Sequence, residues 1–213
     1  MNEDKRHRVD EDKRRDQVRD LVMSGVVTAG GGVYRRVRVS GVGRVEGDVV
    51  CESARIDGVM TVRGTLEAQE LVANGKTKVE GALRGHTIRL SGQIQVDGDC
   101  SAEVVEVSGA VEIDGLVTAD EVTIRLYGGS HVRELGGSRI RVHRSWRWGF
   151  FSRYRRLTVD TVEGDDIRLE ATRARVVRGD KVHIGSGCDI DRVEYRSEFR
   201  QDDGARVGEH VQV

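Results

Sequence analysis

Short runs of alternating apolar and polar residues recur along the first half of the chain, and each run is closed by a glycine. One apolar column returns at every seventeenth position and consists of Val45, Val62, Val79, Val96 and Ile113. Two glycine columns share this spacing: Gly41, Gly58, Gly75, Gly92 and Gly109, and Gly47, Gly64, Gly81, Gly98 and Gly115. Apolar residues two apart predict strands, because successive side chains of a strand point to opposite faces. A fixed period of this kind indicates a stacked repeat architecture.

The glycines predict the corners of the repeat. Most follow Ser, Asp, Asn or Glu, and a short polar residue followed by glycine is typical of turns. A third column of small residues marks a third corner, and it consists of Cys51, Ala68, Gly85, Ala102 and Ala119. Three short strands and three corners in each period of seventeen predict one coil of an all-β, single-stranded β-helix, or β-solenoid. Residue i then stacks on residue i + 17 at about 4.8 Å.

The repeat divides the chain into five parts. Residues 1–20 hold seven acidic and seven Lys or Arg residues, which predicts a disordered charged tail. An irregular lead-in is expected over 21–35 and the regular β-helix block over 36–124. An irregular linker is expected over 125–156. A second, less regular β-helical block is expected over 157–213, where Val159, Val176 and Val193 show the same period of seventeen.

Composition narrows the class of protein. The formal net charge is −1, so the chain as a whole has no bulk attraction to nucleic acid or acidic lipid, and no specific nucleic-acid partner is expected. Aromatic residues make up 4% of the chain and proline is absent, which suits a core of small aliphatic rungs. No apolar run has the length of a membrane-spanning helix, and there is no signal-peptide core. Cys51 and Cys100 fall in columns of small or aliphatic residues, as expected for the core of a reduced, cytoplasmic protein.

Three phrases show the repeat most fully: "VYRRVRVSGVGRVEGDVVCESARIDG", "KVEGALRGHTIRLSGQIQVDGDC" and "VEVSGAVEIDGLVTADEV". In these phrases the chain resembles the bactofilin family of bacterial cytoskeletal proteins, in a longer subgroup with two blocks. The resemblance covers Val33 to about Ile124. A downstream stretch, "VEGDDIRLEATRARVVRGDKVHIGSGCDIDRVEYRSEF", looks like the second block.

The resemblance implies a right-handed, roughly triangular β-helix. It implies that the ends of the helix stack on other subunits into non-polar, nucleotide-independent filaments, so that the main partner is a second copy. Such filaments are similar to scaffolds that localise envelope, morphogenesis or motility proteins in the bacterial cytoplasm. Many family members attach to the inner membrane face through an apolar N-terminal peptide, and here the corresponding residues form the charged tail.

Physics alone also favours assembly through the ends. A solenoid ends in unpaired N–H and C=O groups, which are a template for further strand pairing. The first coil of the regular block is as aliphatic as the middle coils, so its inward residues are the predicted assembly interface: Val37, Val39, Val45 and Val49. The alternative is that Leu21–Val33 folds over this end as an irregular lid.

One segment departs from the uniform composition. The basic-aromatic segment, Arg139–Arg156, contains seven arginines and five of the nine aromatic residues of the chain. Arg and Trp together suit a membrane interface, which predicts contact with the inner membrane face or a protein partner. The predicted contact residues are Arg144, Trp146, Arg147, Trp148, Phe150 and Phe151. Packing of the aromatics against the rod is one alternative, and stacking on single-stranded nucleic acid is another.

No catalytic, cofactor-binding or metal-binding residues are expected. The phrase "ANGKT" lacks the first glycine of a phosphate-binding loop, since that position is Glu70. The histidines show no metal-ligand spacing, and His86 falls in a polar, outward column. The sequence therefore favours a non-enzymatic scaffold. A solenoid acyltransferase and a monomeric binding module that displays the basic-aromatic segment remain the alternatives.

Overall fold

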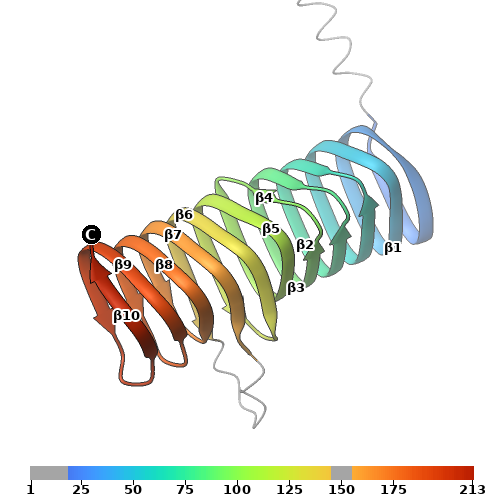
Figure 1. Cartoon of the computed structure of the whole chain (residues 1–213). Coiled ribbons are helices and arrows are strands. Elements are labelled where there is room, and N and C mark those ends of the chain that lie inside the picture. The colour runs from blue at the N-terminus through green and yellow to red at the C-terminus, as the bar shows by residue number, and fades with distance from the viewer. Residues whose placement is uncertain (1–18, 145–154) are drawn as a thin grey trace, which may run out of the picture.

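The computed structural model describes residues 19–144 and 155–213, and in these ranges the chain is built from strands and turns without a helix. Figure 1 shows coils stacked along one axis, with β1 at one end and β10 at the other. The strands are β1 (Leu21–Arg63), β2 (Leu66–Val79), β3 (Leu83–Val96), β4 (Cys100–Ser101), β5 (Val104–Leu126), β6 (Ser130–Arg144), β7 (Leu157–Leu169), β8 (Thr172–Ile184), β9 (Asp189–Gln201) and β10 (Arg206–Gln212).

All strand pairs are parallel, and their order in the sheet is their order in the chain. One inward column can be followed from coil to coil through these pairings. Its nine rungs are Val62, Val79, Val96, Ile113, Val132, Val159, Ala174, Ile190 and Val207. The predicted all-β solenoid is therefore confirmed, and its coils have roughly 17 residues.

Each coil runs over three flat faces, which the pairings of β7 define. Face A consists of Asp166–Leu169 and the residues that stack on them in the other coils. Face B is defined in the same way by Leu157–Val159, and face C by Thr161–Gly164. Single unpaired residues, Asp160 and Asp165, turn the chain between faces. Within each strand, successive side chains point alternately inward and outward, so aliphatic side chains face the interior and polar side chains face the solvent.

The core is a stack of aliphatic ladders. The inward side chains from Val37 to Val193 are buried, and most have an exposed fraction of 5% or less. Each buried Val, Leu or Ile contributes about 1.5–3 kcal/mol relative to an exposed side chain. Because every rung meets a similar rung above and below, side chains of one size fill the interior, and few aromatic residues are needed.

The lead-in predicted to be irregular over residues 21–35 is a further coil of β1. Its glycines allow this coil to approach the next one closely. A Cβ on Gly41 would lie 2.5 Å from the carbonyl oxygen of Gly25, and a Cβ on Gly31 would lie 2.5 Å from that of Asp48. The sequence did not predict this coil for two reasons. Glycines replace apolar residues in its columns, and Gly25 and Gly41 are sixteen residues apart instead of seventeen.

The second block continues the same rod, since β6 pairs with β7 in register. Its spacing differs from the predicted period of seventeen. Val159 stacks on Ala174, a step of fifteen, and Val176 stacks on Arg192, a step of sixteen, so the predicted column of Val159, Val176 and Val193 is wrong. The linker predicted to be irregular is also mostly regular, because β6 forms a full coil. Shorter corners change the spacing without changing which face a residue occupies.

The three cysteines behave as core residues, as expected for Cys51 and Cys100. All three are free and buried. Burial raises the pKa of Cys51 to about 11 and that of Cys100 to about 12. For Cys188 burial is again the main cause of a pKa of about 11. These thiols therefore stay protonated and act as small apolar groups.

The corner glycines make a direct test of coil stacking possible. Gly75 has a φ of +128°, and a Cβ there would lie 2.2 Å from the carbonyl oxygen of Gly58. We expect Gly75→Ala to reduce the free energy of unfolding by more than about 1 kcal/mol, because strain and a backbone clash act together. Gly30→Ala is the matched control, since no atom lies within 4 Å of its Cβ position. Equal melting curves for the two variants would contradict the stacking.

A buried hydroxyl offers a stabilising substitution. The exposed fraction of Thr77 is 2%, and its Oγ1 has no hydrogen-bond partner among the described residues. We expect Thr77→Val to raise the free energy of unfolding by about 1 kcal/mol, because it removes an unpaired polar group at little change in volume. Thr172→Val should do the opposite, because the Thr172 hydroxyl donates to the carbonyl oxygen of Glu170 at 2.9 Å. Urea denaturation of both variants measures the difference.

Candidate functional surfaces

The N-terminal end of the described rod is an apolar sheet edge. Among the described residues, the coil of Leu21–Arg35 has a partner coil on one side only, and on the other side the Arg35 N–H donates to the Arg19 carbonyl oxygen. Met23 of this coil is buried, with an exposed fraction of 1%. Four other residues pack against the core but are only half-buried: Leu21, Val27, Ala29 and Tyr34. This edge presents aliphatic side chains and backbone groups together.

The valines predicted as the assembly interface lie one coil further in. The exposed fraction is 1% for Val37, 2% for Val39 and 0% for Val45 and Val49. They are covered by the coil of Leu21–Arg35, so the end of the rod is displaced from them by one coil. The physical reason is the close glycine stacking described above, which turns the predicted lead-in into the terminal coil.

The C-terminal end carries an aromatic cluster that the sequence reasoning missed. The rings of Tyr195 and Phe199 stack with centroids 5.4 Å apart, and those of Phe199 and His210 stack at 4.8 Å. His210 pairs with Val193 and so occupies an aliphatic column at its last rung. Val207 and Ala205 complete this end as half-buried apolar residues. The signal available in the sequence was the replacement of aliphatic by aromatic residues in the final coil.

Most of the predicted membrane or partner contact lies outside the described residues. Trp146, Arg147, Trp148, Phe150 and Phe151 belong to 145–154, so the structure leaves that prediction open. Arg144 ends β6 as an exposed residue, and its N–H donates to the Glu170 carboxylate at 3.0 Å. The segment is inserted at the corner between face A and face B, where neighbouring coils have only short turns.

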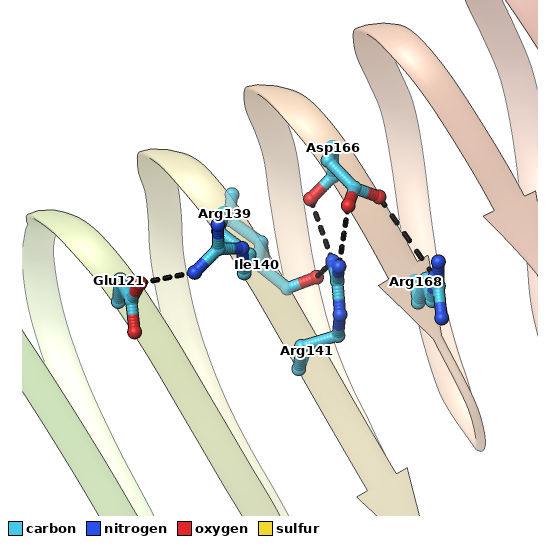
Figure 2. A network of polar contacts seen from close by, with 6 residues as sticks. All are labelled: Glu121, Arg139, Ile140, Arg141, Asp166 and Arg168. Carbon is cyan, nitrogen blue, oxygen red and sulfur yellow. Dashed lines mark hydrogen bonds and ion pairs between the residues drawn. The ribbon is translucent and has the colours of Figure 1, made fainter.

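Face A carries a network of polar contacts around the carboxylate of Asp166 (Figure 2). The Arg141 guanidinium donates to the Asp166 carboxylate and, at 2.9 Å, to the Asp166 carbonyl oxygen. It also donates to the carbonyl oxygen of Ile140 at 3.1 Å. Arg168 approaches Asp166 from the other side, with the Nε and Oδ1 atoms 3.8 Å apart, while Arg139 pairs with Glu121. The network joins three successive coils.

The surroundings of Asp166 favour its ionised form. Partial burial raises the pKa of this carboxyl, but the hydrogen bond and charge of Arg141 and the charges of Arg168 and Arg139 lower it more strongly, so the pKa of Asp166 lies below its ordinary value. A carboxyl with a lowered folded-state pKa stabilises the fold above its unfolded pKa and loses that contribution as the pH falls through the folded value. The network therefore has a structural role.

Three histidines, His86, His143 and His183, lie apart from one another and contact surface carboxylates. His86, which was expected to be exposed, pairs with Glu103 at 2.8 Å, and His183 pairs with Asp202 at 2.9 Å. Within residues 19–144 and 155–213, no three His, Cys, Asp or Glu side chains gather in a way that could hold a metal ion. The described part of the chain also contains no helix long and apolar enough to cross a membrane.

A groove on face C is the second feature that the sequence reasoning missed. It crosses the coils of β5, β6 and β7 and is lined by Leu116, Gly136 and four carboxylates: Asp120, Glu134, Glu163 and Asp165. These residues come together through the pairing of β6 with β7, on either side of the inserted segment. A search at a fixed period of 17 cannot align them, because corresponding residues of β6 and β7 are 27 apart.

The chain is similar in part to two uncharacterised proteins of Bacillus subtilis. It is 44% identical to YhbF over 85 residues, which is 39% of this chain and 35% of YhbF. It is 40% identical to YhbE over 95 residues, which is 42% of this chain and 39% of YhbE. The chain thus matches little more than a third of the length of either relative. No family model matches the chain, and no solved structure matches it.

The network on face A predicts a pH-dependent loss of stability. We expect Asp166→Asn to lower the free energy of unfolding by roughly 1–2 kcal/mol at pH 7, because Arg141, whose side chain is 16% exposed, loses its carboxylate partner. This difference from the unsubstituted protein should shrink as the pH falls below about 4, where Asp166 is protonated in the unfolded chain, and it should vanish only at the lower pH at which the folded chain binds the same proton. Asp165→Asn is the control, since Asp165 forms no ion pair with the described residues, and it should change stability by less than about 0.5 kcal/mol. A pH-independent difference would contradict the assignment.

Proposed function

We propose that this protein is a non-enzymatic scaffold that assembles end to end through its terminal coils into nucleotide-independent filaments. The observation that carries the proposal is the state of the two ends. Among the described residues, the first coil of β1 and the strand β10 each have a neighbour on one side only. Unpaired parallel edges with adjacent apolar residues are templates for further pairing.

The end residues are inward residues that lack a covering coil. Val207 belongs to the same column as Ile190, yet it is half-buried while the exposed fraction of Ile190 is 1%. At the other end, Val27 and Ala29 are half-buried for the same reason. Stacking a second rod on either end would cover these side chains and pair the free N–H and C=O groups in one step.

The resemblance to bactofilins supports the same proposal. The β-solenoid fold is compatible with a polymer-forming scaffold, and in bactofilins the filaments localise envelope, morphogenesis or motility machinery in the cytoplasm. We extend that role to this chain as part of the proposal. The relatives YhbF and YhbE are themselves uncharacterised, so their sequence similarity to this chain does not indicate an activity.

Two other functions were open from the sequence. A solenoid acyltransferase needs a histidine on a loop between coils of adjacent subunits. In the described residues, His86 and His183 lie instead on strands and pair with carboxylates of the neighbouring coils. A monomeric binding module would display the basic-aromatic segment without assembling. The scaffold is favoured over both because the apolar ends need an explanation that neither alternative supplies.

Charge placed on the last rung tests the proposal. We expect Val207→Asp to replace filaments by single rods, because a buried junction cannot accommodate an unpaired carboxylate. Thr158→Asp is the matched control, since Thr158 is exposed on the same face B in the middle of the rod. Filament length in electron micrographs, with circular dichroism to confirm folding, measures the effect. Filaments of equal length in both variants, or none in the unsubstituted protein, would contradict end-to-end assembly.

A further inference from the structure

The groove on face C has a floor without side chains. Gly136 occupies an outward position between Thr118 and Glu163 of the neighbouring coils. A larger residue would fit at position 136 without a clash, because the nearest atom to a Cβ there would be 3.8 Å away. By contrast, a Cβ on Gly137 would lie 2.3 Å from the carbonyl oxygen of Ala119. The missing side chain at Gly136 therefore leaves open space on the sheet rather than solving a packing problem.

The wall of the groove is partly apolar. Leu116 points outward and is 38% exposed, in a column where the neighbouring coil has Glu134. An exposed leucine beside an open glycine floor is a place where a ring or an aliphatic stem can lie flat against the sheet. The groove thus offers apolar contact in addition to charge, which suits side chains such as arginine and tryptophan.

The lining of the groove contains four carboxylates and no Lys, Arg or His. Arg178 of the next coil stacks on Glu163, but it pairs with Glu194. None of the four, Asp120, Glu134, Glu163 and Asp165, forms an ion pair within residues 19–144 and 155–213. Several carboxylates elsewhere on the rod do pair with cations of the adjacent coil, as Glu46 does with Arg63 and Glu106 with Arg89. The groove is therefore a negative surface on a protein whose net charge is only −1.

The complementary charge is present in the chain itself. Residues 144–156 contain five arginines and five aromatic residues, and no acidic residue occurs between Glu134 and Asp160. We propose that the groove binds residues 144–156 of a second copy of this chain. Arginines would meet the carboxylates, and aromatic rings would lie on Leu116 and the glycine floor. This lateral contact is separate from the end-to-end contact proposed above.

The geometry of the coil requires the second copy. Residues 145–154 are inserted where face A meets face B, and the groove lies on face C, the opposite side of the triangle. From Arg155 over face B to Glu163 is eight residues, or roughly 26 Å along the surface. A ten-residue segment anchored at both ends reaches at most about 20 Å outward. The segment of one rod therefore falls short of its own groove.

A contact of this kind is heterologous, since a segment on one side of a rod meets a groove on the other side of the next. Such contacts do not close on themselves, and they can repeat indefinitely. Rods or filaments would therefore lie side by side in bundles. Because the contact joins exposed charges, it should weaken as salt rises and the screening length falls to about 10 Å at 0.1 M.

A charge-swap experiment tests the contact. One protein carries Glu163→Lys and Asp165→Lys, and a second carries Arg147→Glu and Arg153→Glu. We expect the unsubstituted protein at low salt to form bundles wider than one rod in electron micrographs. Each variant alone should give particles of single-rod width, and an equimolar mixture of the two should restore wide bundles, because the reversed groove then meets the reversed segment.

The controls separate this proposal from the others. The control variant carries Glu112→Lys and Asp114→Lys, which make the same charge change at two exposed positions outside the groove. It should leave the width of the bundles unchanged. The lateral contact is overturned if the groove variant keeps wide bundles, if the mixture stays narrow, or if the unsubstituted protein is one rod wide. It is also overturned if the segment variant loses binding to phosphatidylglycerol vesicles while bundle width is unchanged, since the segment then binds lipid. Particle length reports end-to-end assembly independently of width.

Discussion

Parallel pairing of each coil with the next is the interaction on which the rest of the structure depends. It places each residue about 4.8 Å from its counterpart in the following coil, so that the backbone N–H and C=O groups of adjacent coils form hydrogen bonds with one another. Inward positions must then be alike from rung to rung, which explains the nine-rung column from Val62 to Val207. Corners must be small where backbones approach closely, as at Gly75 over Gly58. The same pairing leaves one unmatched edge at each end of the described rod.

Much of the fold follows from the sequence because this interaction repeats. The period of seventeen over residues 36–124 predicts the strands, the corners and the buried columns, and the pairing of Leu66 with Leu83 is the register it implies. Prediction fails where the corners change length. The terminal coil at Leu21–Arg35, the insertion between Arg144 and Leu157, and the shortened step from Val159 to Ala174 all keep the faces while shifting the spacing.

The candidate surfaces were harder to predict for the same reason. The groove depends on Glu134 and Glu163 lying on adjacent coils, although the inserted segment separates them in the chain. The position of the rod end one coil before Val37 depends on glycine contacts that have no apolar signature. The aromatic cluster around Phe199 depends on the position of the last rung. Each arises from the register of neighbouring coils, which a fixed period does not determine.

If rods stack end to end, the filament is a continuation of the rod. X-ray diffraction from oriented filaments tests this most directly. End-to-end stacking predicts a meridional reflection near 4.8 Å, from strands that run across the axis without interruption, together with a subunit repeat on the order of 50 Å. A filament whose 4.8 Å reflection lies off the meridian, or a preparation that remains single rods at high protein concentration, would contradict it.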